Sequence, residues 1–331
     1  MSSRLPRICF FGCGRMAGHH ARLLRTLFPK IELWFASRDR EKARLVASQH
    51  RGAGFFGSYT RAAESEEFDI SFLTTPHAFH ADLAVLSAKH GKDLIIEKPV
   101  TRTLEELATV EAAVDESGVR CTVAENYYFK PAIGVMSAFM REGLIGEVLF
   151  IDLTKTNRQK ESGWRTDRAL MGGGALLEGG VHWLNALISL SGGIPVGVIA
   201  IKPEVKEPTL IPLEDSLLLV ARFSNGVVGR LLHSWRVPNR FFGMGLSKIY
   251  GTEGVITFES NGLFCSVYGR KRKKRLMHPR DFLGFRPMHR SFIQDWVSGK
   301  PWRPSLGRIR QDLALVHAAY RSLETRRFEK V

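Results

Sequence analysis

The decisive stretch of the chain is Arg7-Ile-Cys-Phe-Phe-Gly12-Cys-Gly14-Arg-Met-Ala17, close to the N-terminus. Its apolar start is typical of a buried parallel strand. Gly12 permits a tight turn, and Gly14 lets the backbone approach a diphosphate without a Cβ in the way. Ala17 is small enough for the following helix to pack on the strand, so that the amides at the helix N-terminus face the phosphates. The stretch therefore predicts a dinucleotide-binding domain at the start of the chain.

The composition is that of an ordinary globular protein, and 331 residues are enough for two domains. No apolar run approaches the roughly 18 residues that span a bilayer. The N-terminus does not have the pattern of a signal peptide, because its apolar run leads straight into the glycine turn. The cysteines have no zinc or redox spacing and are scattered over Cys9, Cys13, Cys121 and Cys265. We expect reduced thiols in a cytoplasmic protein that does not bind membranes.

The net charge of +15 and the run Arg270-Lys-Arg-Lys-Lys-Arg275 raise the question of nucleic-acid binding. No helix-turn-helix, zinc-finger or RNA-recognition signature accompanies the run. It follows a strand-like segment, residues 263–268, and Gly269, so we expect a solvated hairpin or loop and no nucleic-acid partner. The excess positive charge would equally favour phosphorylated ligands.

Strand and helix patterns alternate from residue 7 to about residue 124. The expected strands cover Arg7–Phe11, Ile31–Ala36, Asp69–Leu73, Leu94–Ile96 and Arg120–Ala124. The expected helices cover Met16–Leu27, Arg40–Gln49, Phe79–Lys89 and Leu104–Glu116. Such alternation predicts a parallel sheet with helices on both faces, in which ligands bind at the carboxyl ends of the strands. We expect a Rossmann domain over residues 1–125.

The pattern changes after residue 125. A helix at Ala132–Arg141 precedes a strand at Glu147–Lys155, and a helix at Ala175–Ser191 follows a glycine cluster. Strand-like segments with turn signals then extend from Val196 to about Tyr268, and a last helix covers Leu306–Glu324. Residues 126–331 are therefore expected to form an α+β domain with a large, mostly antiparallel sheet.

The end of the second expected strand bears on the choice of dinucleotide. In such folds an acidic residue about 20 residues past the glycines binds the adenosine ribose of NAD. Here Ser37 stands near that position and Arg38 follows it. An arginine beside a small hydroxyl suits the 2′-phosphate of NADP. Asp39 could be the missing acid in a shifted register, or the N-cap of the next helix. We expect NADP in preference to NAD.

Further polar segments begin where strands are expected to end: Thr74-Thr-Pro76-His77-Ala-Phe-His80, Glu97-Lys98-Pro99 and Glu125-Asn126-Tyr-Tyr128-Phe-Lys130-Pro131. Later, Trp164-Arg165 precedes Gly172-Gly-Gly-Ala-Leu-Leu-Glu178-Gly-Gly-Val-His182. With these motifs the chain resembles the Gfo/Idh/MocA oxidoreductase family nearly end to end. The Glu-Lys-Pro triplet is the most specific of them.

The resemblance implies a Rossmann domain and a second α/β domain that use NAD(P) to oxidise or reduce a sugar, polyol or related carbonyl compound. By position, Lys98 matches the family's active-site lysine and His182 its catalytic histidine. A histidine suits the base that removes the hydroxyl proton, and an ammonium stabilises the resulting alkoxide charge. Glu178 stands where the family usually has an aspartate, and either binds a substrate hydroxyl and tunes His182 or merely forms an i,i+4 pair. Asn185 also replaces a common aspartate.

The candidate site residues follow from these assignments. The cofactor ligands are expected to be Gly12, Gly14, Arg15, Met16, Ser37, Arg38, Thr75, Pro76, His80, Glu97, Lys98 and Asn126. The candidate substrate ligands are Tyr128, Lys155, Asn157, Trp164 and Arg165, and a scaffold role is equally compatible with each. No metal is expected, because the histidine pairs 19/20 and 77/80 have no clear third ligand.

Two other functions stay open at this point. The chain could be a dinucleotide-binding sensor or scaffold that lost the chemistry, or an NAD-dependent enzyme that cleaves glycosides. The resemblance also implies a homodimer or homotetramer, in which the open face of the second domain's sheet packs on another copy.

Overall fold

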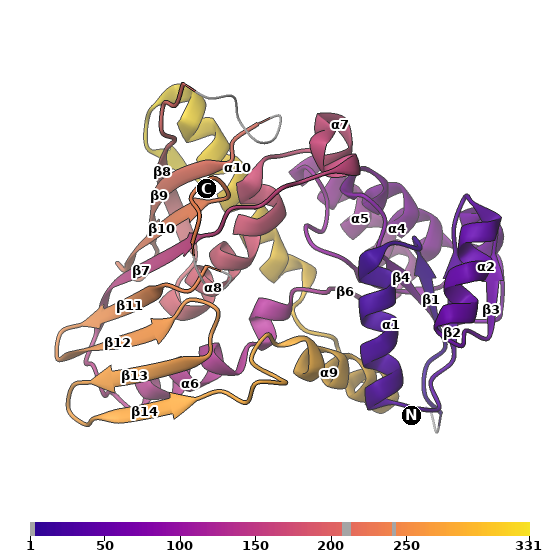
Figure 1. Cartoon of the computed structure of the whole chain (residues 1–331), viewed down its shortest axis with the longest axis horizontal. Coiled ribbons are helices and arrows are strands. Elements are labelled where there is room, and N and C mark those ends of the chain that lie inside the picture. The colour runs from indigo at the N-terminus through magenta and orange to yellow at the C-terminus, as the bar shows by residue number, and fades with distance from the viewer. Residues whose placement is uncertain (1–3, 207–212, 240–242) are drawn as a thin grey trace. The chain divides into compact units, whose positions relative to one another are not determined.

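The computed structural model describes residues 4–206, 213–239 and 243–331, which form two compact units (Figure 1). The first unit contains the described residues up to Glu125 together with Phe285–Ile309. The second contains Asn126–Gly284 and Arg310–Val331. The segment 285–309, which we assigned to the second domain, therefore packs within the first. A local pattern indicates that a helix has an apolar face, but does not indicate which distant element that face covers.

The first unit is built on a six-stranded parallel sheet with the order β3-β2-β1-β4-β5-β6. Its strands are β1 (Ile8–Phe11), β2 (Leu33–Ala36), β3 (Gly54–Phe56), β4 (Ile70–Leu73), β5 (Asp93–Ile96) and β6 (Cys121–Val123). This is the strand order of a dinucleotide-binding Rossmann fold, in which the direction of winding reverses between β1 and β4. The predicted parallel sheet is confirmed.

Helices flank this sheet in Figure 1, and four of them agree with the predicted bounds to within one residue at each end. They are α1 (Arg15–Leu27), α2 (Arg40–Gln49), α3 (Tyr59–Ala63), the 3-10 turn η1 (His77–Phe79), α4 (His80–Lys89), α5 (Leu104–Ser117) and α9 (Phe285–Ser298). Thr103 caps α5 by accepting the Glu106 N–H, and Gly118 ends it with φ +65°. The sequence analysis missed β3, α3 and α9, of which the first two are too short for a periodic signal.

The second unit is built on a nine-stranded sheet with the order β14-β13-β12-β11-β7-β10-β9-β8-β15. The strands are β7 (Val148–Thr156), β8 (Pro195–Ile201), β9 (Ser216–Phe223), β10 (Val228–Ser234), β11 (Leu246–Gly251), β12 (Gly254–Glu259), β13 (Phe264–Tyr268), β14 (Lys273–Leu276) and β15 (Glu329–Lys330). Strands β7 and β10 pair in parallel, and the other neighbours are antiparallel. The predicted large, mostly antiparallel sheet is confirmed.

Among the residues that the structure describes, helices cover one face of this sheet and apolar side chains are exposed on the other. Helix α6 (Pro131–Arg141) packs on β13, and α8 (Val181–Ser191) packs on β7 and β10. Gly229 in β10 makes room for α8, because a Cβ there would lie 2.6 Å from the Leu187 side chain. The opposite face exposes apolar side chains, among them Phe150 (54%) and Leu276 (80%). The chain also contains α7 (Arg168–Met171), the 3-10 turns η2 (Asn126–Phe129) and η3 (Gly163–Thr166), and α10 (Leu306–Thr325).

The helix that carries Glu178 and His182 differs from the expected continuous α-helix over 175–191. Residues Leu176–Gly180 form a π-helical turn, η4, and only then does α8 begin at Val181. Such wide turns are frequent at functional sites. Local composition favours a helix here but does not distinguish the two kinds of turn.

The basic run forms the hairpin that we expected. Strands β13 and β14 pair antiparallel, with Val267 opposite Lys273. Arg270 pairs with Glu253 and Lys273 with Glu142, so acidic neighbours already compensate part of the charge. Within the described residues, every helix is too short or too polar to cross a bilayer.

Candidate active site

The glycine turn joins β1 to α1 at the carboxyl end of the parallel sheet. Gly12 has φ +105°, and a Cβ there would lie 2.9 Å from the backbone of Thr74 and Thr75. Gly14 is the N-cap residue of α1 and makes no side-chain cap, and a Cβ on it would meet no described atom within 4 Å. Gly12 is therefore required by a close neighbouring loop, whereas Gly14 leaves space in front of the helix N-terminus. Arg15 and Met16 form the first residues of that helix.

The loop after β4 presents a buried hydroxyl beside this turn. Thr75 is 7% exposed, and its Oγ1 atom has no hydrogen-bond partner among the described residues. An unsatisfied buried hydroxyl costs about 1–3 kcal/mol, so a polar ligand atom at this edge would stabilise it. Pro76 follows as the N-cap residue of η1. The open helix N-terminus and the orphaned hydroxyl fit the diphosphate of a dinucleotide.

The loop after β2 shows one of the two roles that we considered for Asp39, the helix cap. Its carboxylate accepts the Lys42 N–H at 3.0 Å and thereby caps α2. Ser37 is nearly buried, and its Oγ accepts the Asp39 N–H at 3.1 Å. The guanidinium of Arg38 lies exposed, 4.8 Å from the centre of the Phe79 ring in η1. A cation thus stands at the same sheet edge as the glycine turn.

A buried chain of three side chains holds the Glu-Lys-Pro triplet. Oε1 of Glu97 lies 2.6 Å from Nε2 of His20, and Oε2 accepts the Lys98 N–H at 3.0 Å. Nδ1 of His20 lies 2.9 Å from Nε2 of His289 in α9. Burial alone would raise the pKa of Glu97, but the hydrogen bond and charge of His20 outweigh it and lower that pKa. Burial holds the pKa of His289 well below its usual value. Sequence reasoning missed His289, because nothing local marks its pairing.

His80 lies in the interior of the first unit, between two of the loops at this edge. Its ring nitrogens each lie 3.0 Å from a backbone carbonyl oxygen, one of Thr75 and one of Pro99. Burial lowers the pKa of His80 to about 4. Of the predicted cofactor ligands in this unit, His80 is thus placed to connect the loops after β4 and β5.

The glycine-rich segment of the second unit is anchored to a buried carboxyl group. Oε1 of Glu214 accepts the Leu176 N–H at 2.7 Å, and its backbone carbonyl accepts the Ala175 N–H. The Tyr320 hydroxyl donates to Oε1 and accepts the Gly174 N–H at 2.9 Å. Burial raises the pKa of Glu214 to about 7. These bonds hold the amides at the start of the π-helical turn, and sequence reasoning missed both Glu214 and Tyr320.

Glu178 pairs with the loop that precedes it. It is almost fully buried in the π-helical turn, and its Oε1 accepts the Arg165 Nε–H at 2.7 Å. The Arg165 guanidinium also stacks on the Trp164 ring at 4.5 Å, and Trp164 packs on Met171 and its neighbours. Two of the predicted substrate residues therefore meet one of the predicted catalytic residues.

His182 lies against an aromatic ring from η2. The rings of His182 and Tyr127 are stacked, with centroids 4.7 Å apart and planes 14° apart. Nζ of Lys130 lies 3.7 Å from the centre of the same Tyr127 ring. Neither Tyr127 nor Lys130 was among the predicted site residues, although both stand in the motif that begins at Glu125.

The other substrate candidates are spread over the second unit. Nζ of Lys155 donates to Oδ1 of Asn261 at 2.6 Å, and burial lowers the pKa of Lys155 to about 8. His233, opposite Lys155 in β10, is buried, and burial together with the charges of Lys155 and His182 lowers its pKa to about 3. The structure thus adds His233 to the surroundings of His182.

The remaining candidates are held by their neighbours. Asn157 donates its backbone N–H to the Ser234 carbonyl at 2.9 Å. The Asn126 amide donates to the Leu283 carbonyl at 2.7 Å, and the Tyr128 ring meets Phe129 edge-on. Asn185, the second departure from the family pattern, donates to Oδ2 of Asp312 at 2.7 Å. An aspartate at 185 would place two buried carboxylates together, so the amide fits this chain.

Two family models match the chain. Residues 6–125 match the model described as oxidoreductase family, NAD-binding Rossmann fold, and residues 135–257 match the GFO/IDH/MocA C-terminal domain. The chain belongs to the Gfo/Idh/MocA oxidoreductase family.

Known proteins of this family are similar over part or all of the chain. A levoglucosan dehydrogenase of Pseudarthrobacter phenanthrenivorans is 28% identical over 244 residues, which are 65% of this chain and 62% of that protein. A D-xylose 1-dehydrogenase [NADP(+)] of Haloarcula marismortui is 30% identical over 52% of this chain and 50% of its own length. The match thus spans less than two thirds of either relative. A solved structure, levoglucosan dehydrogenase in complex with NADH and levoglucosan, has a TM-score of 0.86 at 22% identity and covers 99% of this chain and 100% of that one.

Proposed function

We propose that this protein is an NAD(P)-dependent dehydrogenase that transfers a hydride between a nicotinamide cofactor and a sugar, polyol or related hydroxy or carbonyl compound. The observation that carries the proposal is the edge of the parallel sheet. There the open Gly14 turn, the orphaned Thr75 hydroxyl and the Glu97-Lys98-Pro99 triplet follow β1, β4 and β5. Family membership and the sugar dehydrogenases among the relatives support it.

NADP is the preferred cofactor in this proposal. Asp39 is engaged as a helix cap, and the Arg38 guanidinium lies exposed beside Ser37 at the ribose end of the expected site. A guanidinium binds a 2′-phosphate through charge-assisted hydrogen bonds. The relatives include an NADP(+) enzyme and a structure with NADH, so the choice rests on Arg38.

The chain's own residues supply proton transfer and orientation. When bound, the nicotinamide accepts or returns the hydride. His182 takes the proton of the substrate hydroxyl at a ring nitrogen, and the Lys98 ammonium stabilises the negative charge on that oxygen. Glu178, fixed by Arg165, orients His182 or a substrate hydroxyl. Lys155, Asn157, Tyr128 and Trp164 are proposed to contact the substrate.

Three residues act behind these groups. Glu97 and His20 hold the backbone at Lys98. His80 contacts backbone carbonyls of the loops after β4 and β5 and so holds these two loops together. We assign them to positioning in this proposal, because each is buried and bonded within the unit.

Assembly and location are also proposals. The exposed apolar face of the nine-stranded sheet, with Phe150 and Tyr268 on it, favours a homodimer or homotetramer. The four free cysteines agree with a cytoplasmic protein, which we propose as its location.

The test begins with binding. NADPH and NADH are titrated by fluorescence into the wild type, Arg38→Ala and the control Arg40→Ala, a neighbouring exposed arginine. The proposal expects tighter binding of NADPH that only Arg38→Ala weakens. If the wild type binds NADPH no more tightly than NADH, or if Arg38→Ala does not weaken NADPH binding, the choice of NADP from Arg38 is overturned. Binding of neither cofactor would overturn the redox function.

Turnover is tested with the preferred cofactor. A panel of levoglucosan, D-xylose, inositols and other sugars is assayed with the wild type, Lys98→Met and His182→Asn. We expect oxidation of at least one compound and a loss of about 100-fold or more in kcat for either variant, the size typical of removing a general base or an oxyanion-stabilising group. Cofactor binding without turnover on any compound would favour the sensor function instead.

A further inference from the structure

Tyr127 contacts two potentially cationic groups of the second unit. Its ring is stacked on His182, with 4.7 Å between the centroids and nearly parallel planes. The ammonium of Lys130 lies 3.7 Å from the centre of the same ring. Both separations are short enough for direct interaction with the ring face. The tyrosine thereby connects a buried lysine to the histidine.

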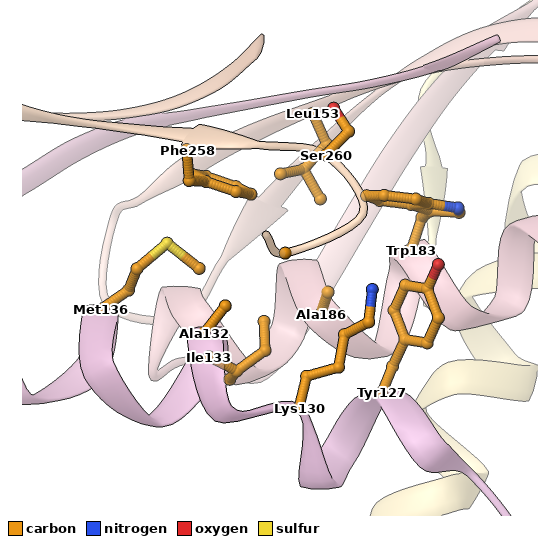
Figure 2. A pocket seen from close by; sticks show the side chains of 11 residues that line it. Tyr127, Lys130, Ala132, Ile133, Met136, Leu153, Trp183, Ala186, Phe258 and Ser260 are labelled. Atoms are coloured by element: carbon orange, nitrogen blue, oxygen red, sulfur yellow. The ribbon is translucent and has the colours of Figure 1, made fainter. Parts of the chain in front are cut away.

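Lys130 is held firmly in this place. Its side chain is almost fully buried, and Nζ donates to the backbone carbonyl of Asn261 at 2.7 Å. The Trp183 ring lies 5.6 Å from Nζ on another side. Figure 2 shows Lys130 beside the Tyr127 ring and beneath Trp183, in a pocket whose other walls include Met136, Leu153 and Phe258. Apolar walls keep water away, and desolvation strengthens a cation–π contact.

Helix formation does not explain a lysine here. Lys130 is the N-cap residue of α6 and makes no side-chain cap. Serine, threonine, aspartate and asparagine favour that position, and a cation is electrostatically unfavourable at a helix N-terminus. Burying the ammonium also carries a desolvation cost. The lysine is therefore present in spite of α6, and its contacts with Asn261 and Tyr127 indicate its role.

We propose that Lys130 is a positioning residue that acts on His182 through the ring of Tyr127. The inference rests on the proposed function, because it takes His182 as the base. The ammonium fixes the tyrosine ring, and the stacked tyrosine fixes the plane of the imidazole.

Other titratable groups near His182 come from neighbouring elements and are not mutated in the test. Lys155 on β7 and His233 on β10 face α8, and Glu178 precedes it in the π-helical turn. Asn261 bonds both lysines: its Oδ1 accepts a hydrogen bond from Lys155, and its backbone carbonyl accepts one from Lys130. Because the two lysines share Asn261, the Tyr127→Leu background is needed to separate an effect that the ring carries from one that passes through Asn261 and Lys155.

The experiment compares Lys130→Met, Tyr127→Leu and the double variant in the full chain. Tyr127→Phe retains the ring, and Lys130→Arg retains the charge. The matched control is Lys248→Met, a lysine 6.0 Å from the Tyr250 ring on the same sheet. Two quantities are measured: the pH profile of kcat/KM, and the pH titration of the His182 ring by NMR of histidine-labelled protein, assigned with His182→Asn.

We expect Lys130→Met to lower kcat/KM about tenfold, with a smaller change in cofactor KM. The acidic limb of the profile and the His182 titration should move together to higher pH, because a positive charge near the ring pair is removed. Lys130→Arg and Tyr127→Phe should retain most of the wild-type behaviour. In the Tyr127→Leu background, Lys130→Met should have little further effect.

The NMR titration keeps the inference separate from the proposed function. If the wild type turns over no substrate, the proposed function fails, while a shift of the His182 titration in Lys130→Met still supports the positioning role. An unchanged titration and pH profile in Lys130→Met overturns the inference. So does an undiminished effect of Lys130→Met in the Tyr127→Leu background, because the ring would then not carry it.

Discussion

Nε2 of His20 lies 2.6 Å from Oε1 of Glu97, inside the first unit, and the other carboxylate oxygen of Glu97 receives the amide of Lys98. One buried carboxylate therefore bonds a histidine of α1 and the backbone of the proposed catalytic lysine. Nε2 of His289 lies next to Nδ1 of His20, the ring nitrogen that does not face Glu97, and adds a third buried side chain to this arrangement. The arrangement explains why a glutamate precedes the lysine: its two oxygens accept from two different segments at once.

Replacing Glu97 by glutamine should destabilise the first unit. The glutamine NH2 group would face a donor, so one buried hydrogen bond is lost and a polar group is left unsatisfied. We expect a loss of about 2–4 kcal/mol in the free energy of unfolding, measured by urea denaturation at pH 7. Glu41→Gln, at an exposed pair with Arg44, serves as the control and should leave the midpoint unchanged. An unchanged midpoint for Glu97→Gln would contradict the buried role.

The same pair gives a pH dependence. Because the pKa of Glu97 is lowered in the folded state, its contribution is present above the carboxyl's unfolded pKa. The contribution is lost as the pH falls through the folded value. Wild type and Glu97→Gln should therefore converge in stability on acidification, and divergence on acidification would count against this assignment.

Two alanine substitutions in the glycine turn should have different effects. Gly12→Ala places a Cβ 2.9 Å from the Thr74 and Thr75 backbone at φ +105°, so it should cost about 2–3 kcal/mol in stability. Gly14→Ala meets no described atom within 4 Å and should fold normally. Its Cβ would project into the space assigned to the diphosphate and should weaken NADPH binding tenfold or more, by about 1.4 kcal/mol. Thermal unfolding and NADPH titration separate the two, and normal NADPH affinity in Gly14→Ala would place the phosphates elsewhere.

Glu214 should make stability fall as the pH rises from about 4.5 to 7. Burial raises its folded pKa to about 7, so the folded state binds the proton more tightly than the unfolded chain does. The penalty is absent below the unfolded pKa, grows between the two values and is constant above about 7. It amounts to about 3 kcal/mol. Glu214→Gln should remove this part of the pH dependence in urea denaturation series, and a persisting slope would assign it to another group.

The sequence predicts the parts of the fold that have a local cause. The glycine turn, the parallel strands and most helices of the first unit follow from short apolar runs, helical periodicity and glycine ends. Strand β3 escapes because Gly54-Phe-Phe is only three residues long. The π-helical turn at 176–180 has no local signal, and the groups that bind the amides at its start, Glu214 and Tyr320, lie far along the chain.

The candidate site likewise combines residues that the sequence predicts with residues that it does not. Lys98, Glu178 and His182 stand in motifs that a sequence displays directly. The groups that hold them come from far along the chain: His289 lies 269 residues from His20, and Asn261 lies 131 residues from Lys130. Lys130 itself carried a readable signal, since a lysine before Pro131 is a poor N-cap. Which ring it would contact depends on packing that no local pattern contains.

Asn185 offers a test of whether this chain's departure from the family pattern is a local adaptation. Its amide donates to Asp312 at 2.7 Å, and both side chains are buried. Asn185→Asp places two carboxyl groups at hydrogen-bond distance, so the pair must share a proton or repel. We expect a loss of about 3 kcal/mol or more at pH 8. The raised folded pKa of the pair makes this loss grow as the pH rises and vanish toward pH 4.

The double variant Asn185→Asp with Asp312→Asn exchanges the partners and should recover most of the stability at pH 8, measured by thermal and urea unfolding. Recovery would show that the residues at 185 and 312 stabilise the fold through their mutual hydrogen bond. A double variant as unstable as Asn185→Asp would mean that the Asn185 amide stabilises the fold through contact with another residue.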